Sequence, residues 1–189
     1  PMILQGNANI CLFYVSDSEI NELRQELEEK GLHITPLLAT EFCGIVKLAH
    51  PLAKLDVLQK EDLSAYPIVT ATGFFSGGAR FARWASQHCQ ITSVPNFYLL
   101  RSVMEQENML GIGTAFSFAA AKIYDPARHK LLHFSEDLFS PQMHYCLIQR
   151  DESYLRYPEK IMTNEILDYF RTFSAEEYGG QFIGKGEGA

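Results

Sequence analysis

Apolar runs and amphipathic stretches alternate along the chain. A continuous apolar run over residues 9–15 predicts a buried strand. Apolar residues then recur at helical spacing over residues 20–27, which predicts an exposed amphipathic helix that stops at Gly31. Ser16 and Glu19 have the spacing of a capping box ahead of this helix.

The same alternation continues to residue 173. Further strands are predicted at residues 33–48, 68–70, 91–94, 131–134 and 143–150, and helices within residues 74–89, 96–109 and 158–173. Ser76 and Asn96 are candidate N-caps of the first two of these helices. Strands that alternate with helices over short connections predict an α/β fold.

Two stretches between residues 37 and 70 resemble a known family. Residues 39–53 read ATEFCGIVKLAHPLA and residues 63–69 read LSAYPIV, and this order resembles the effector-binding domain of LysR-type transcriptional regulators. Residues 111–117, GIGTAFS, are similar to a glycine-rich segment of that family, with Ser117 about where proline is usual. Residues 6–12, GNANICL, are similar to another, with Asn9 in place of the usual aspartate. The resemblance covers residues 3–173.

The resemblance implies a type II periplasmic-binding-protein-like fold with two lobes and an incomplete first lobe. Residues 1–44 and 145–175 would form the partial first lobe, and residues 45–144 the second lobe. Residues 176–189 would be a flexible tail. The family's first strand-helix-strand unit and its winged helix-turn-helix do not appear among these residues, so any contact with DNA would need a domain absent from this chain. The resemblance also implies a homodimer or tetramer and a small-molecule effector bound between the lobes.

Charge and cysteine content are consistent with a sensor rather than a nucleic-acid binder. The chain has 16 Lys and Arg against 23 Asp and Glu, a net charge of −7, and no basic run that could displace counterions from DNA.

The four cysteines lie far apart without a zinc spacing, which is typical of reduced core thiols in a cytoplasmic protein: Cys11, Cys43, Cys89 and Cys146. No apolar run is long enough for a membrane span, and no signal peptide is visible, so we expect a cytoplasmic protein without a membrane partner.

Three segments are candidates for binding a small polar ligand, because strand ends and helix starts present hydroxyls and backbone N–H groups. The first contains Thr70, Thr72, Gly73 and Ser76. The second contains Ser93, Asn96 and Phe97. The third joins Tyr14 and Ser16 to Gly113 and Thr114. The competing interpretation is structural: Ser76 and Asn96 would be plain helix caps, the glycines turns and Phe97 a core residue. Arg80 and Arg101 are the nearest cations, so a strongly anionic effector is not required.

Catalysis has little support in the sequence. Nucleophile elbows, zinc-protease helices, phosphate loops and dinucleotide fingerprints do not occur, and no cofactor or metal is predicted. His129 and His133 are four residues apart, but His133 falls in a predicted strand, where this spacing does not bring side chains together. We therefore predict a ligand-sensing domain and not an enzyme. A solute-binding protein of a transport system is the alternative, and an enzyme on the same fold is a third class.

Overall fold

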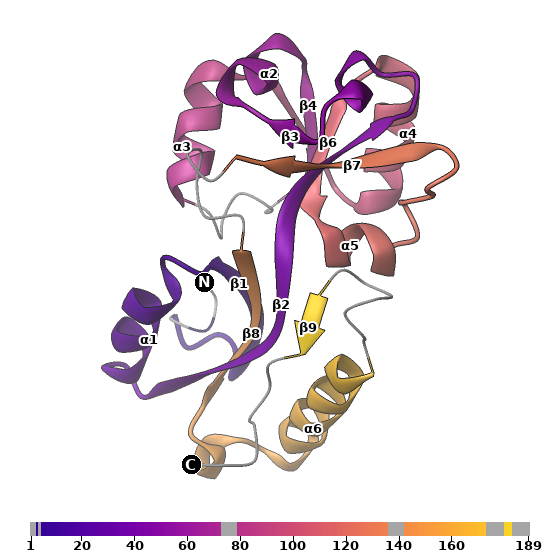
Figure 1. Cartoon of the computed structure of the whole chain (residues 1–189). Coiled ribbons are helices and arrows are strands. Elements are labelled where there is room, and N and C mark those ends of the chain that lie inside the picture. Colours follow the sequence, from indigo (N-terminus) through magenta and orange to yellow (C-terminus); the bar gives the residue numbers. More distant parts are fainter. Residues whose placement is uncertain (1–2, 4, 73–78, 136–141, 173–179, 183–189) are drawn as a thin grey trace. The chain divides into compact units, whose positions relative to one another are not determined.

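The chain forms two compact α/β units that share one long strand (Figure 1). The computed structural model describes residues 3, 5–72, 79–135, 142–172 and 180–182. Unit 1 comprises Pro1–Thr40 and Gln142–Ala189, and unit 2 comprises Glu41–Pro141. Strand β2 (Leu32–Lys47) contributes residues to both units.

Unit 1 is a sheet with a helix on each face. Strand β1 (Ile10–Ser16) pairs antiparallel with β8 (Gln142–Arg150), and β8 lies next to β2. Helix α1 (Ile20–Glu28) covers one face, where Ile20 packs with Cys146 of β8. Helix α6 (Tyr157–Arg171) covers the other, where Phe170 packs on Tyr145 with ring centroids 6.2 Å apart. Residues 145 and 146 are neighbours in a strand, so their side chains point to opposite faces.

The last described element of unit 1 is a short strand. Strand β9 (Gly180–Phe182) pairs antiparallel with Leu38–Thr40 of β2. These three residues fall within the segment expected as a flexible tail, and that expectation did not include a strand. The pairing depends on contacts with residues about 140 positions earlier, which local pattern cannot reveal.

Unit 2 is a mixed sheet with the strand order β3-β7-β2-β6-β4-β5. Its remaining strands are β3 (Val57–Leu58), β4 (Ile68–Ala71), β5 (Ile91–Val94), β6 (Leu110–Thr114) and β7 (His129–Phe134). Its helices are α2 (Lys60–Ala65), α3 (Ala79–His88), α4 (Phe97–Glu107) and α5 (Ala115–Ala120). Strands β4, β5 and β6 are mutually parallel, and β2 runs antiparallel to β6 and β7. The predicted α/β class is therefore confirmed.

Two glycines of β6 let the core of unit 2 pack closely. A Cβ at Gly111 would lie 2.7 Å from Cγ2 of Ile45, and a Cβ at Gly113 would lie 2.7 Å from the ring of Phe118. Ile45 and Phe118 are fully buried in the main hydrophobic cluster of this unit. Neither glycine has a positive φ. Both are glycine because side chains of the core occupy the space that a Cβ would need.

Two local expectations differ from the structure. Ser16 and Glu19 do not form a capping box: Ser16 Oγ donates to the Glu19 carboxylate at 2.7 Å, and Glu19 itself is the N-cap without a side-chain cap bond. The spacing brought the side chains together, but they bind each other and not the helix N–H groups. Helix α5 was not predicted, because its apolar sequence AFSFAA has no amphipathic period to reveal a helix.

Candidate functional site

The carboxyl ends of three parallel strands meet at one edge of unit 2. Strands β4, β5 and β6 end at Ala71, Val94 and Thr114, and the register pairs Ala71 with Val94. Because parallel strands share their direction, these ends lie side by side. Helices α4 and α5 begin directly after β5 and β6. We call this the carboxyl edge, and it holds the described unit 2 residues of the predicted site.

Two threonines at the carboxyl end of β4 have different roles: Thr70 lies within the strand, and Thr72 follows it. Thr70 is fully buried, and its Oγ1 donates to the carbonyl of Ile112 at 3.3 Å, so its hydroxyl ties β4 to β6 inside the sheet. Thr72 is exposed, and both its N–H and its hydroxyl donate to the carbonyl of Val94, at 2.7 and 3.0 Å. The hydroxyl oxygen of Thr72 keeps its lone pairs and can accept a hydrogen bond from a ligand. Predicted residues Gly73 and Ser76 lie outside the described residues.

Strand β5 and the start of α4 supply an exposed polar pair. Ser93 and Asn96 are both exposed, and Asn96 Oδ1 accepts the N–H of Leu99 at 2.9 Å, which confirms the predicted N-cap. The NH₂ group of Asn96 and the hydroxyl of Ser93 can donate to a ligand. Phe97 is half-buried and packs edge-on against Phe118, with ring centroids 6.2 Å apart, so part of its ring belongs to the core.

Thr114, the last residue of β6, also lies at the carboxyl edge. Its Oγ1 accepts the N–H of Ser117 at 3.0 Å and lies 2.7 Å from the Ser117 hydroxyl, so Thr114 is the N-cap of α5. Both hydroxyls are buried. Gly113 is buried beneath them. These residues fix the strand end from within, whereas Thr72, Ser93 and Asn96 face outward.

Tyr14 and Ser16 belong to unit 1. The half-buried Tyr14 ring lies 5.9 Å from the ring of Tyr145, and burial, together with Tyr145, raises the pKa of the Tyr14 phenol well above its ordinary value. The phenol is therefore a neutral hydrogen-bonding group at physiological pH. Ser16 is buried and bound to Glu19. Whether these residues share a ligand with the carboxyl edge stays a prediction.

The surroundings of the histidines and cysteines differ from residue to residue. His129 is buried, while His133 is exposed and its Nδ1 lies 2.6 Å from the Glu41 carboxylate. All four cysteines are free, and burial raises the pKa of Cys43 and, to about 12, that of Cys146. Within the described ranges, no three His, Cys, Asp or Glu side chains could hold a metal ion together. Nor does that part of the chain contain a helix long and apolar enough to cross a membrane.

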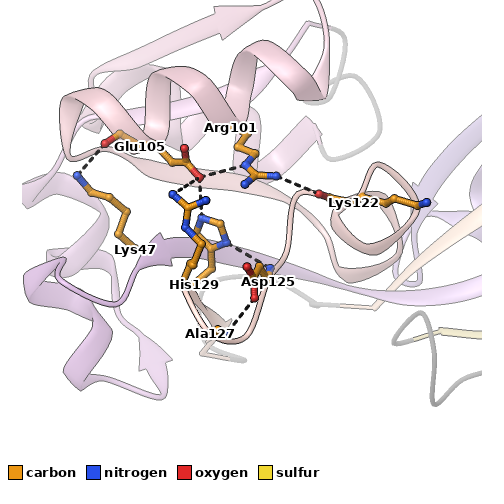
Figure 2. A network of polar contacts seen from close by, with 8 residues as sticks. Lys47, Arg101, Glu105, Lys122, Asp125, Ala127 and His129 are labelled. Atoms are coloured by element: carbon orange, nitrogen blue, oxygen red, sulfur yellow. Dashed lines mark hydrogen bonds and ion pairs between the residues drawn. The ribbon is translucent and has the colours of Figure 1, made fainter.

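One polar cluster was missed by sequence reasoning. Glu105 in the last turn of α4 contacts Arg101 of the same helix, Arg128 in the turn before β7, and His129, the first residue of β7 (Figure 2). Arg101 therefore points to Glu105, although it was expected to be among the cations nearest the ligand loops. The i, i+4 spacing of Arg101 and Glu105 was visible in the sequence. The approach of β7, more than 20 residues later, had no local signal.

The two units, joined by a strand that both share, have a type II periplasmic-binding-protein-like fold, as the sequence predicted. More narrowly, this is the fold of the regulatory domains of LysR-family regulators. No family model and no curated protein matches the chain in sequence. The likeness to solved structures therefore establishes the fold.

Three solved structures illustrate the likeness. The regulatory domain of MetR, a LysR family regulator from N. meningitidis, superposes with a TM-score of 0.67 at 16% identity, covering 96% of this chain and 78% of that chain. The effector binding domain of QuiR in complex with shikimate gives 0.59 at 17% identity, covering 90% and 76%. The reduced OxyR regulatory domain from Pseudomonas aeruginosa gives 0.58 at 15% identity, covering 91% and 76%. All three are described as regulatory or effector-binding domains.

Proposed function

We propose that the chain is the small-molecule effector-sensing domain of a LysR-type transcriptional regulator, without its winged helix-turn-helix. The observation that carries this proposal is the likeness in fold, over at least 90% of the chain, to three regulatory domains of that class. The net charge of −7 supports a regulator in which a segment other than this chain binds DNA. In this proposal the chain works in the cytoplasm and has no catalytic activity.

The carboxyl edge is the proposed effector site in unit 2. Thr72, Ser93 and Asn96 are exposed there and together offer hydroxyl oxygens, hydroxyl donors and an amide. Such a set suits a small hydroxylated or amide-bearing molecule. Since QuiR was solved with shikimate, a polyhydroxylated carboxylate, compounds of this class are the first probes to use. An effector can shift a regulator only by the difference between its affinities for two conformations.

The test is an NMR titration of the 189-residue chain with shikimate and a panel of related hydroxylated carboxylic acids and amides. We expect at least one compound to shift the amide signals of Thr72, Ser93 and Asn96. An Asn96→Asp variant keeps the helix cap, because aspartate caps as well as asparagine, but it replaces the amide donors with a negative charge. This variant should bind a carboxylate compound at least about tenfold more weakly, in line with the cost of lost hydrogen bonds to a charged group.

Asn164→Asp is the matched control, since Asn164 is an exposed residue of α6 in unit 1 and the charge change is the same. Equal weakening by both variants, or a panel that leaves the carboxyl edge unshifted, would refute this site. The regulator assignment has its own test, because the gene should encode a winged helix-turn-helix ahead of these residues. A signal peptide in that place would favour a transport protein instead.

A further inference from the structure

A groove lies at the edge of the unit 2 sheet opposite to the carboxyl edge. It has a volume of about 520 Å³, within the range of small-molecule sites. The groove is lined by Lys47, Leu48, Ala49, Glu105, Gln106, Ala127, Arg128 and His129. Lys47 ends β2 and His129 begins β7, and the two are paired in register. Because β2 runs antiparallel to β6, Lys47 lies near the start of β6, whereas the carboxyl edge lies at its end.

The Glu105 carboxylate, which lines this groove, has several polar contacts (Figure 2). Glu105 Oε1 lies 3.0 Å from Nε of Arg101, 3.3 Å from Nε2 of His129 and 3.8 Å from Nη2 of Arg128. Nζ of Lys47 donates to the backbone carbonyl of Glu105 at 3.0 Å. Burial alone would raise the pKa of Glu105, but the hydrogen bond and charge of Arg101, with Arg128 and His129, lower it overall. The half-buried Glu105 side chain is thus held in its ionised form.

His129 holds this carboxylate in place from inside the unit. Its side chain is 1% exposed, and its Nδ1 accepts the backbone N–H of Asp125 at 3.2 Å. With Nδ1 engaged as an acceptor, the proton of the neutral ring lies on Nε2, which faces Glu105. The turn that follows Asp125 is itself fixed, because the Asp125 carboxylate accepts the N–H of Ala127 at 3.0 Å. The position of Arg128 therefore depends on an ordered turn and a buried imidazole.

The groove holds more positive charge than its carboxylates neutralise. Among the residues that line the groove, Lys47 and Arg128 carry two positive charges against one negative charge on Glu105, so one positive charge remains in a chain whose net charge is −7. Figure 2 shows the Lys122 side chain pointing away, with only its carbonyl used, by Arg101. This local positive charge is opposite in sign to the net charge of the chain.

Hydrogen-bond donors also remain unused there. Among the described residues, the Arg128 side chain contacts only Glu105, at 3.8 Å, which is beyond hydrogen-bond length, and it is 57% exposed. Its five N–H donors are thus available in the planar fork that fits a carboxylate or phosphate in two places. The Lys47 ammonium uses one of its three donors on the Glu105 carbonyl. Leu48, Ala49 and Ala127 add an apolar lining beside these cations.

We propose that this groove is a second ligand site, separate from the carboxyl edge, that binds a small molecule through a carboxylate or phosphate group held by Arg128 and Lys47. The Glu105 backbone carbonyl holds Lys47, and its carboxylate lies 3.8 Å from Arg128, while Arg101 and His129 contact the same carboxylate. The proposal does not depend on the effector site, because the two sets of residues are disjoint.

The probes are inorganic phosphate and citrate, each titrated into the 189-residue chain at constant ionic strength, so that general screening stays the same. NMR shifts report the position of binding, and isothermal titration reports the affinity. We expect shifts at Leu48, Ala127, Arg128 and His129 and not at Thr72, Ser93 or Asn96. Tighter binding of phosphate or of citrate identifies the preferred group, and either result supports the site.

Arg128→Gln is the decisive variant, because this exposed side chain contributes little to packing. It should weaken binding of the preferred probe about tenfold, and Arg128→Lys should give an intermediate loss, since lysine keeps the charge but not the fork. Arg83→Gln is the matched control: Arg83 is an exposed residue of α3 in the same unit. Absence of binding by both probes would overturn the proposal. So would an equal loss in the Arg83 variant, or unchanged affinity in Arg128→Gln.

Discussion

Replacing Gly111 with alanine should destabilise unit 2 through a steric clash rather than through backbone strain. The new Cβ would lie 2.7 Å from Cγ2 of Ile45 and 3.2 Å from both Leu100 Cδ2 and Met104 Sδ. All three neighbours are fully buried, and they come from β2 and α4, so relief requires the helix to move away from the sheet. Overpacking of this kind costs about 1–3 kcal/mol.

A smaller gain opposes this cost. Alanine has fewer conformations than glycine in the unfolded chain, which favours the folded variant by about 0.4–1 kcal/mol where the backbone is compatible. Gly111 has no positive φ, so its backbone is compatible. At the middle of the two ranges, the net loss in the free energy of unfolding is about 1.3 kcal/mol.

The assay is urea unfolding followed by tryptophan fluorescence. The chain has one tryptophan, Trp84 in α3, so the signal reports unit 2, which contains Gly111. The midpoint should fall by roughly 0.5–1 M urea. The control is the same change in an Ile45→Leu background, which removes the Cγ2 methyl while conserving side-chain volume. There the penalty should fall to less than half, and an equal penalty in both backgrounds would refute a clash with Ile45.

Gly31 provides the contrasting mechanism. It has φ +67°, and a Cβ added there would meet nothing within 4 Å, so alanine costs backbone strain alone, about 1 kcal/mol. Asparagine tolerates this conformation better than alanine and should cost less. At Gly111 the larger asparagine should cost more than alanine. The opposite order at either position would contradict the assigned mechanism.

Two further predictions concern ionisable groups. Iodoacetamide at pH 8 should label Cys43 and Cys146 in the folded chain orders of magnitude more slowly than after urea unfolding, because burial raises the pKa of both thiols, to about 12 for Cys146. Mass spectrometry of the labelled peptides measures the two rates. Fast labelling of Cys146 in the folded chain would contradict this prediction. Hydrogen bonds from Arg156 and Asn9 lower the pKa of Glu159 from 4.5 to about 2, so the stability that the carboxylate contributes is present above about pH 5 and is lost as the pH falls toward 2. Glu159→Gln should therefore lower the thermal unfolding temperature at pH 7 but not near pH 2, and a constant difference by circular dichroism would rule out this linkage.

The features that could be predicted from the sequence are those with local causes. Gly31 follows α1 with a positive φ, and Asn96 caps α4, because both roles depend on residues within one turn of the helix. The long strand β2 was predicted to within one residue at each end. This strand could be predicted because its apolar run is continuous in sequence and is followed closely by His50-Pro51.

The features that could not be predicted depend on distant residues. The packing partners of Gly111 and Gly113 could not be predicted, since the side chains that exclude a Cβ there come from β2, α4 and α5. Likewise, Thr70 was a ligand candidate from its sequence neighbours, yet its hydroxyl binds a carbonyl 42 residues later. Residue type fixes the available chemistry, but tertiary pairing decides which groups stay exposed.

Helix α4 connects the two proposed sites. Asn96 caps its first turn at the carboxyl edge, while Glu105 in its last turn lines the groove that also contains Lys47 and Arg128. Nine residue steps along the helix separate Asn96 from Glu105, which is about 14 Å at the rise of an α-helix. Both ligands would therefore contact opposite ends of one rigid element that packs on β4, β5 and β6. If occupancy of one end changes the affinity at the other, thermodynamic linkage requires the same factor in both directions. Measuring phosphate affinity with and without effector, and effector affinity with and without phosphate, thus gives two independent values of one coupling free energy, and unequal values would show that a third equilibrium takes part.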